Sequence, residues 1–223
     1  MPDDARKVPG KIPSHELTYV RLRDMVLFGV LAPGQPVTIQ GLITDLGAGM
    51  TPVREAIRRL TAEGALEPQG NRRVTVPRLQ PGVLDQLAFA RLTIEPRLAD
   101  LAAATLTPKL IAQLAALDDR VNAAIRSGDV SGYLTANHAF HFALYEASGA
   151  SVLIDMARSL WLRFGPSLRV VATLAGAAGL PDQHAEALAA MRAGDGPRLA
   201  QAIHDDIAQG VEEVRAALAR GDV

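Results

Sequence analysis

The 223-residue chain contains no cysteine, a single tryptophan and no apolar run long enough to cross a bilayer. The absence of cysteine excludes disulfides, thiolate zinc sites and cysteine nucleophiles. A membrane-spanning helix needs about 18 consecutive apolar residues. The first residues, up to Lys11, are polar and contain no apolar segment of a signal peptide. These absences predict a cytoplasmic protein with no membrane partner.

Aromatic residues are scarce, at 4% of the chain, whereas alanine and leucine supply 38 and 29 residues. Alanine and leucine favour helices, and strands draw on β-branched and aromatic side chains. The composition therefore predicts a mainly α-helical protein. The net charge is −1, but residues 1–78 carry 11 basic and 8 acidic side chains while the remainder is acidic. This asymmetry permits an anionic partner at the N-terminal end.

Residues 14–77 alternate helix-favouring stretches with turn residues. Thr51 and Pro52 have the form of an N-cap followed by a proline at the first helical position. Two short β segments flank a Gly-Asn turn at residues 70–71, which is typical of a hairpin. Three helices followed by a hairpin are the order of a winged helix-turn-helix. We expect this DNA-binding domain to follow a disordered lead-in at residues 1–13.

The third predicted helix carries two arginines on its solvent side. Arg54 and Arg58 are four residues apart and lie opposite the apolar stripe, and guanidinium groups suit bidentate contacts with guanine edges or phosphates. Thr51 at the helix start can bond a phosphate. Arg72 and Arg73, just past the hairpin turn, can reach phosphates or the minor groove. Taken alone, each arginine could simply be an ordinary solvent-exposed residue. The winged-helix order of the elements is what favours DNA binding.

After a linker at residues 78–81, residues 82–223 are predicted to form an all-helical bundle. Three of its helices place polar side chains on their apolar stripes, and such groups must be hydrogen-bonded. These polar side chains have two possible roles. They could form an internal ion pair and hydrogen bonds from histidines to carbonyl groups, or they could line a cavity that binds a ligand or a metal ion. We favour the cavity. The polar residues concerned are Arg91, Glu95, Asn137, His141 and His184.

Two strings in the N-terminal part closely resemble the GntR family of bacterial transcription regulators. They are FGVLAPGQ at residues 28–35 and TPVREAIRRL at residues 51–60, and the resemblance covers residues 15–77. It implies a homodimer that binds a short palindromic double-stranded DNA operator, with one winged helix on each half-site. The positions that match the family's DNA contacts are Thr51, Arg54 and Arg58.

The C-terminal part resembles the FCD ligand-binding domain of the FadR-like branch of the same family, over residues 82–215. The resemblance rests on RLTIE at residues 91–95, NHAFH at residues 137–141, His184, and AGD at residues 193–195. Such domains are helical bundles that bind a metal ion and a small organic acid. Their usual ligands are an Asp and a His four residues apart and two further histidines. The corresponding set here is Asn137, His141, His184 and Asp206.

The last helix leaves a choice between two inward residues. His204 and Asp206 each lie about a quarter-turn from the apolar stripe, so periodicity does not decide between them. The resemblance selects Asp206, which would also supply the carboxylate that Asn137 lacks. Two imidazoles, an amide oxygen and a carboxylate suit zinc, nickel or manganese. A purely organic pocket without metal stays an alternative.

Arg91 is a permanent positive charge on a core-facing stripe, so with Glu95 beside it we expect it to contact a small carboxylate effector. The sequence thus predicts a ligand-responsive transcription regulator, a repressor that a small organic acid releases from its operator. The alternative is a metal-dependent hydrolase with His141 and His184 at the ion. No residue stands out as base or nucleophile, so we expect the protein not to be an enzyme. A helical scaffold for protein partners is a third hypothesis, and buried polar stripes count against it.

Overall fold

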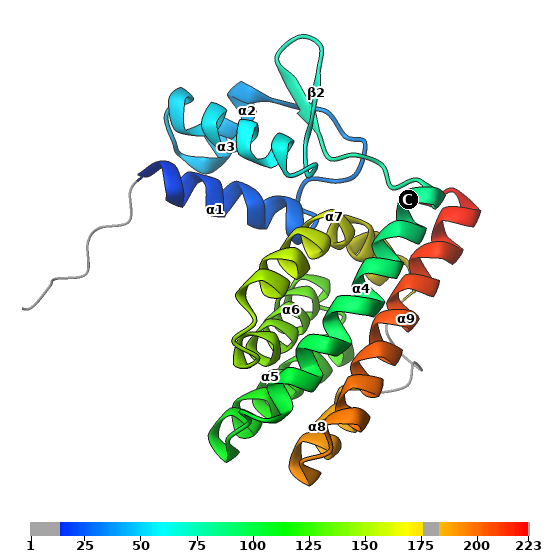
Figure 1. Ribbon diagram of the computed structural model, residues 1–223. Helices are drawn as coiled ribbons and strands as arrows, with labels where there is room; N and C mark the ends of the chain where they lie inside the picture. Colours follow the sequence, from blue (N-terminus) through cyan, green and yellow to red (C-terminus); the bar gives the residue numbers. More distant parts are fainter. Residues whose placement is uncertain (1–13, 176–182, 223) are drawn as a thin grey trace, which may run out of the picture.

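The computed structural model describes residues 14–175 and 183–222, so the predicted lead-in at residues 1–13 lies outside the described residues. The fold is mainly α, with an N-terminal winged helix-turn-helix and a C-terminal helical bundle, as predicted (Figure 1). No helix in the described ranges is long and apolar enough to cross a membrane. The elements are α1 (Ser14–Leu27), β1 (Val37–Thr38), α2 (Ile39–Leu46), α3 (Met50–Ala62), β2 (Glu67–Gln69), β3 (Arg73–Thr75), α4 (Pro81–Ala103), α5 (Pro108–Ser127), α6 (Val130–Ala147), α7 (Ser151–Ala175), α8 (Gln183–Ala193) and α9 (Gly196–Arg220).

The wing is an antiparallel sheet in which β3 lies between β1 and β2. The two-residue strand β1 is too short for an alternation pattern, and sequence reasoning missed it. The predicted Gly-Asn turn is wrong in length, because Gln69 pairs with Arg73 and the turn therefore spans residues 70–72. Both Asn71 and Arg72 adopt left-handed backbone angles, with φ of 61° and 56°. Arg72 thereby becomes part of the wing tip.

The start of α3 also differs from the prediction. The N-cap is Gly49 and the helix begins at Met50, so Thr51 lies inside the first turn rather than at the cap. Pro52 does not oppose the earlier start, since the first-turn N–H groups have no partner within the helix. The amide of Val53 already donates to the Gly49 carbonyl, at 3.3 Å. Thr51 remains exposed at the positive end of the helix.

The described part of the bundle is all-helical, as predicted, and the long helices α4 and α9 lie side by side along it (Figure 1). The buried face of α4 carries Leu84, Leu87 and Leu98, and both Arg91 and Glu95 lie buried on this face. Gly128 and Gly194 end α5 and α8 in left-handed conformations, where a glycine avoids the Cβ clash. The polar stripes expected from periodicity are therefore inside the bundle.

The two parts of the chain meet where the end of α1 rests on α7. A Cβ atom on Gly165 of α7 would lie 2.3 Å from the carbonyl oxygen of Leu27, so only glycine permits this approach. One turn later, Arg169 donates from Nη1 to the Phe28 carbonyl, at 3.1 Å. The rings of Phe28 and His138 of α6 also form a T-shaped contact, with centroids 5.7 Å apart. These contacts fix the winged helix on the bundle through α6 and α7.

Candidate metal site and DNA-binding surface

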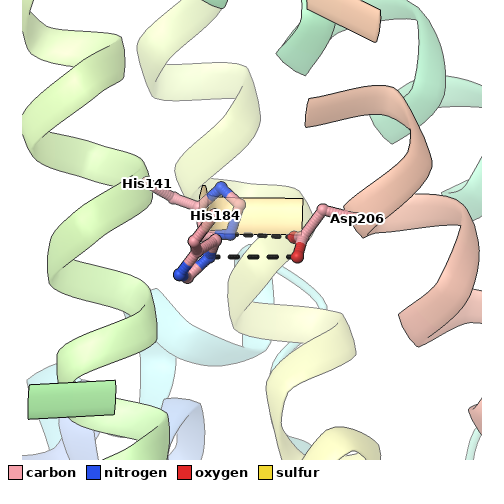
Figure 2. A group of neighbouring side chains, drawn as sticks. All are labelled: His141, His184 and Asp206. Carbon is pink, nitrogen blue, oxygen red and sulfur yellow. Dashed lines mark ion pairs between the residues drawn. The ribbon is translucent and has the colours of Figure 1, made fainter. Parts of the chain in front are cut away.

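Two imidazoles and one carboxylate converge inside the bundle from three different helices (Figure 2). His141 lies on α6, His184 on α8 and Asp206 on α9, and one ligand atom of each lies within 4.8 Å of the others. The Nε2 atom of His141 is 3.1 Å from Asp206 Oδ2, and the Nε2 atom of His184 is 3.8 Å from Asp206 Oδ1. The structure thus brings three of the four predicted ligands together.

The tautomer of His141 follows from a chain of hydrogen bonds. The hydroxyl of Tyr145 donates its proton to Glu95 Oε2, at 2.7 Å. The Tyr145 oxygen can then only accept from Nδ1 of His141, which lies 3.0 Å away. The Nδ1 atom therefore carries the proton, and Nε2 is left with a lone pair. This Nε2 atom is buried and has no aligned hydrogen-bond partner among the described residues.

A second carboxylate orients His184 in the same way. Nδ1 of His184 lies 3.1 Å from Oδ1 of Asp118, a buried residue of α5. An ionised carboxylate only accepts hydrogen bonds, so Nδ1 is again the protonated nitrogen and Nε2 faces Asp206. The ring also stacks on Phe140, with centroids 4.0 Å apart. Metal-binding histidines are typically held by such a carboxylate behind the ring.

Two nitrogen lone pairs and a carboxylate that face one another repel unless a cation lies between them. The donor set therefore fits a divalent cation such as zinc, nickel or manganese. Asn137 lies one turn before His141 and lines the same cavity as Asp206.

The ambiguity on the last helix is resolved by the geometry. His204 is 42% exposed, and its Nδ1 atom lies 3.1 Å from the carboxylate of its neighbour Asp205. Asp206 instead lies beside both imidazoles. The twist of α9 relative to its neighbours, which periodicity alone does not reveal, turns the carboxylate toward the cluster.

Arg91 and Glu95 form the internal ion pair that the sequence allowed. Arg91 Nε donates to Glu95 Oε1 at 2.6 Å, and the guanidinium lies 4.7 and 4.5 Å from the ring centroids of Trp161 and Phe164. Arg91 Nη1 donates no hydrogen bond to any residue that the structure describes. Arg91 lines a cavity of about 50 Å³ next to Asp206. Because small-molecule pockets usually measure about 300–1,000 Å³, an organic acid would need neighbouring side chains to move.

The expected DNA-binding side chains are exposed on α3 and at the tip of the wing. Helix α3 buries Val53, Ala56, Ile57 and Leu60, which leaves Thr51, Arg54 and Arg58 in solvent. Arg58 is 76% exposed and pairs with Glu55 one turn before it, at 2.7 Å. Arg54 has no partner among the described residues. The wing tip adds Arg72 and Arg73, both exposed.

Comparison with known families matches both parts of the chain. The model of the bacterial regulatory proteins of the gntR family matches residues 15–76, and that of the FCD domain matches residues 86–209. The chain belongs to the GntR family, in the branch with an FCD domain. It is therefore a transcription regulator rather than an enzyme, and the comparisons give the hydrolase alternative no support. The GntR domain implies DNA binding and the FCD domain implies a small-molecule effector.

Two transcription regulators are similar over most of the chain, one of them by structure as well. The regulator McbR of Escherichia coli K12 is 33% identical over 147 residues, which are 66% of this chain and 66% of McbR. An HTH-type regulator from an unstable DNA locus of Streptomyces ambofaciens is 30% identical, over 89% of this chain and 85% of that protein. The structure of E. coli McbR/YncC superposes with a TM-score of 0.88 at 27% identity, over 93% of this chain and 100% of that chain.

Three residues of this GntR-family regulator support the cluster but were missed from the sequence. Tyr145 lies one turn after His141, and Asp118 lies on the stripe of Leu114 and Val121, so periodicity could have drawn attention to both. Trp161 donates to Glu95 Oε2 at 2.8 Å. Nothing in the sequence pairs this tryptophan with a residue 66 positions earlier, because tertiary packing alone brings them together.

Proposed function

We propose that this GntR-family regulator is a homodimeric repressor of a palindromic operator, and that a small carboxylate bound with a divalent metal ion releases it. Two winged helices are needed because a single module buries too little DNA for tight specific binding. Dimers of such modules read half-sites at a fixed spacing, so a change in that spacing lowers operator affinity. The effector would act by biasing the bundle toward an arrangement with the wrong spacing.

The exposed surface of α3 supports a direct reading of DNA. Arg54 is free to make bidentate contacts with guanine, while Arg58 would exchange its pair with Glu55 for a DNA contact. Thr51 and the free N–H groups of the first turn would bind a phosphate. The wing arginines Arg72 and Arg73 would contact the backbone and so position the domain without selecting sequence.

His141, His184 and Asp206 would hold the metal ion, with Asn137 as a neighbouring oxygen donor. The ion would provide open positions that attract the carboxylate of an effector. Other residues of the chain would orient the imidazoles and bind the effector. Glu95 and Asp118 fix the two imidazoles, Glu95 through Tyr145, and Arg91 Nη1 offers a donor to an anion entering beside Asp206.

Control of DNA binding by a ligand is supported by one observation: α7 contacts both the residues around the candidate metal site and the DNA-binding domain. Trp161 of α7 donates to Glu95, the residue that holds both Arg91 and Tyr145. One turn later, Gly165 lies against the end of α1, and Arg169 binds the Phe28 carbonyl. A shift of α7 at the effector site would therefore move α1 and, with it, the winged helix.

Operator binding tests the first half of the proposal. With the DNA upstream of the protein's own gene, Arg54→Ala should weaken specific binding by about 1–3 kcal/mol, because a bidentate base contact is lost. Arg72→Ala should weaken binding to all sequences alike and reduce the salt slope by about 0.9. Arg120→Ala, at an exposed arginine of α5, is the control and should change nothing. Unchanged operator affinity of a folded Arg54→Ala variant would contradict the assignment.

A ligand screen tests the second half. We expect small carboxylates to raise the melting temperature of the zinc-loaded protein and, at the same concentrations, to weaken operator binding. The metal-free protein should respond less, because the cluster would then lack the cation that attracts a carboxylate. If only neutral or cationic compounds stabilise the protein, Arg91 serves structure alone and the effector class is wrong.

A further inference from the structure

Helix α4 presents a large aromatic side chain to solvent on the face that points away from the bundle. Phe89 is 75% exposed, although the opposite face of the same helix packs against α6, α7 and α9. Figure 1 shows α4 at the front of the bundle, with no element of the chain in front of it. Burying this phenyl ring against a partner would remove apolar area from water and so favour association.

Phe89 belongs to a ridge of exposed residues spaced by four along α4, and this ridge is complementary to itself. Its members are Asp85, Phe89, Thr93 and Arg97. In two antiparallel copies related by a twofold axis between Phe89 and Thr93, Asp85 faces the partner's Arg97 and Phe89 faces the partner's Thr93. The two ends of the ridge carry opposite charges, so the antiparallel arrangement is attractive at both ends whereas the parallel one places like charges together.

We propose that this ridge is the dimer interface of the effector domain, formed by α4 of two copies of this chain. The inference rests on the homodimer proposed above and identifies the surface that forms it. A twofold axis makes each contact occur twice, as in other closed homodimers.

The local contacts of the ridge leave its side chains ready for burial. The hydroxyl of Thr93 donates to the Phe89 carbonyl at 2.7 Å, so its polar atom is satisfied and its methyl group can cover a phenyl ring. Asp85 pairs with Arg215 at 2.7 Å, and Arg97 pairs with Asp100. Both ion pairs are exposed and contribute little by themselves, so Asp85 and Arg97 can join a larger network across the interface.

The test is the oligomeric state of the full chain by sedimentation equilibrium at micromolar concentration. The wild type should be a dimer of the 23.6 kDa chain. Phe89→Asp should raise the dimer dissociation constant at least about 30-fold, as loss of an interface hot spot does. Val152→Asp, at a side chain of α7 that is 72% exposed, is the matched control and should leave the dimer intact.

Reversal of the charges tests the antiparallel arrangement separately. Asp85→Arg and Arg97→Asp should each weaken the dimer about tenfold, and the double variant should restore wild-type affinity. A dimer that persists in Phe89→Asp, or charge reversals that show no mutual rescue, would overturn the assignment of this surface. A monomeric wild type, with or without operator DNA, would instead overturn the homodimer of the proposed function together with it.

Discussion

Replacing Glu95 with glutamine tests whether this residue organises the interior of the bundle. Its carboxylate is fully buried and accepts hydrogen bonds from Arg91, Tyr145 and Trp161, at 2.6, 2.7 and 2.8 Å. A glutamine of the same shape has one acceptor oxygen and one NH₂ group. Whichever way the amide turns, its NH₂ group meets a donor, and the guanidinium of Arg91 loses its counter-charge.

The magnitude follows from the burial of the pair. Removing one partner of a buried ion pair costs about 3–5 kcal/mol, because the remaining charge is left without compensation. For a chain of 223 residues, about 2–4 °C of melting temperature corresponds to each kcal/mol. We therefore expect Glu95→Gln to lower the melting temperature by about 6–20 °C, measured by calorimetry or circular dichroism.

The same substitution at Glu146 provides a matched control. Glu146 is exposed and pairs with Arg158 on the bundle surface, so Glu146→Gln should cost less than about 1 kcal/mol. The reasoning is refuted if Glu95→Gln costs no more than the control. In that case water or a rearranged side chain replaces the lost acceptor, and Glu95 does not hold the cluster together.

Further predictions concern the metal, the coupling and the pH dependence. Elemental analysis of the purified protein should find no metal in His141→Ala and Asp206→Ala, whereas His204→Ala should keep the metal. Loss of the metal in the His204 variant alone would show that the wrong residue of α9 has been assigned. Arg169→Ala removes the hydrogen bond to the end of α1, so the effector should change operator affinity at least about fivefold less than in the wild type; an unchanged effector response would exclude this contact from the coupling. Burial lowers the pKa of His138 from 6.5 to about 3. Between these two pH values, His138 binds a proton in the unfolded chain but not in the folded chain. Stability should therefore fall as the pH drops below about 6.5, by up to about 1.4 kcal/mol per unit, and His138→Leu should flatten this dependence in denaturant titrations at pH 4–7; an unchanged slope would contradict it.

The sequence by itself determined the architecture and the chemistry available to it. Local signals such as the glycines that end α5 and α8 mark helix boundaries, because they act within a few residues of the backbone. The string at residues 51–60 places arginines opposite an apolar stripe, and helical geometry then exposes them. Periodicity also placed Arg91, Glu95 and His141 inside the bundle, where the structure has them. Each of these inferences needs only the geometry of a single helix.

Tertiary structure decided what single helices leave open. The inward residue of α9 depends on the rotation of that helix against α6 and α8, so helical periodicity alone leaves Asp206 and His204 equivalent. The hydrogen bond from Trp161 to Glu95 spans 66 residues, and the ionic contact of Asp118 with His184 spans the same distance along the chain. Side chains this far apart in the sequence meet only because the helices pack in one particular arrangement. The sequence therefore supplied the groups that could bind a cation, and helix packing decided which of them face one another.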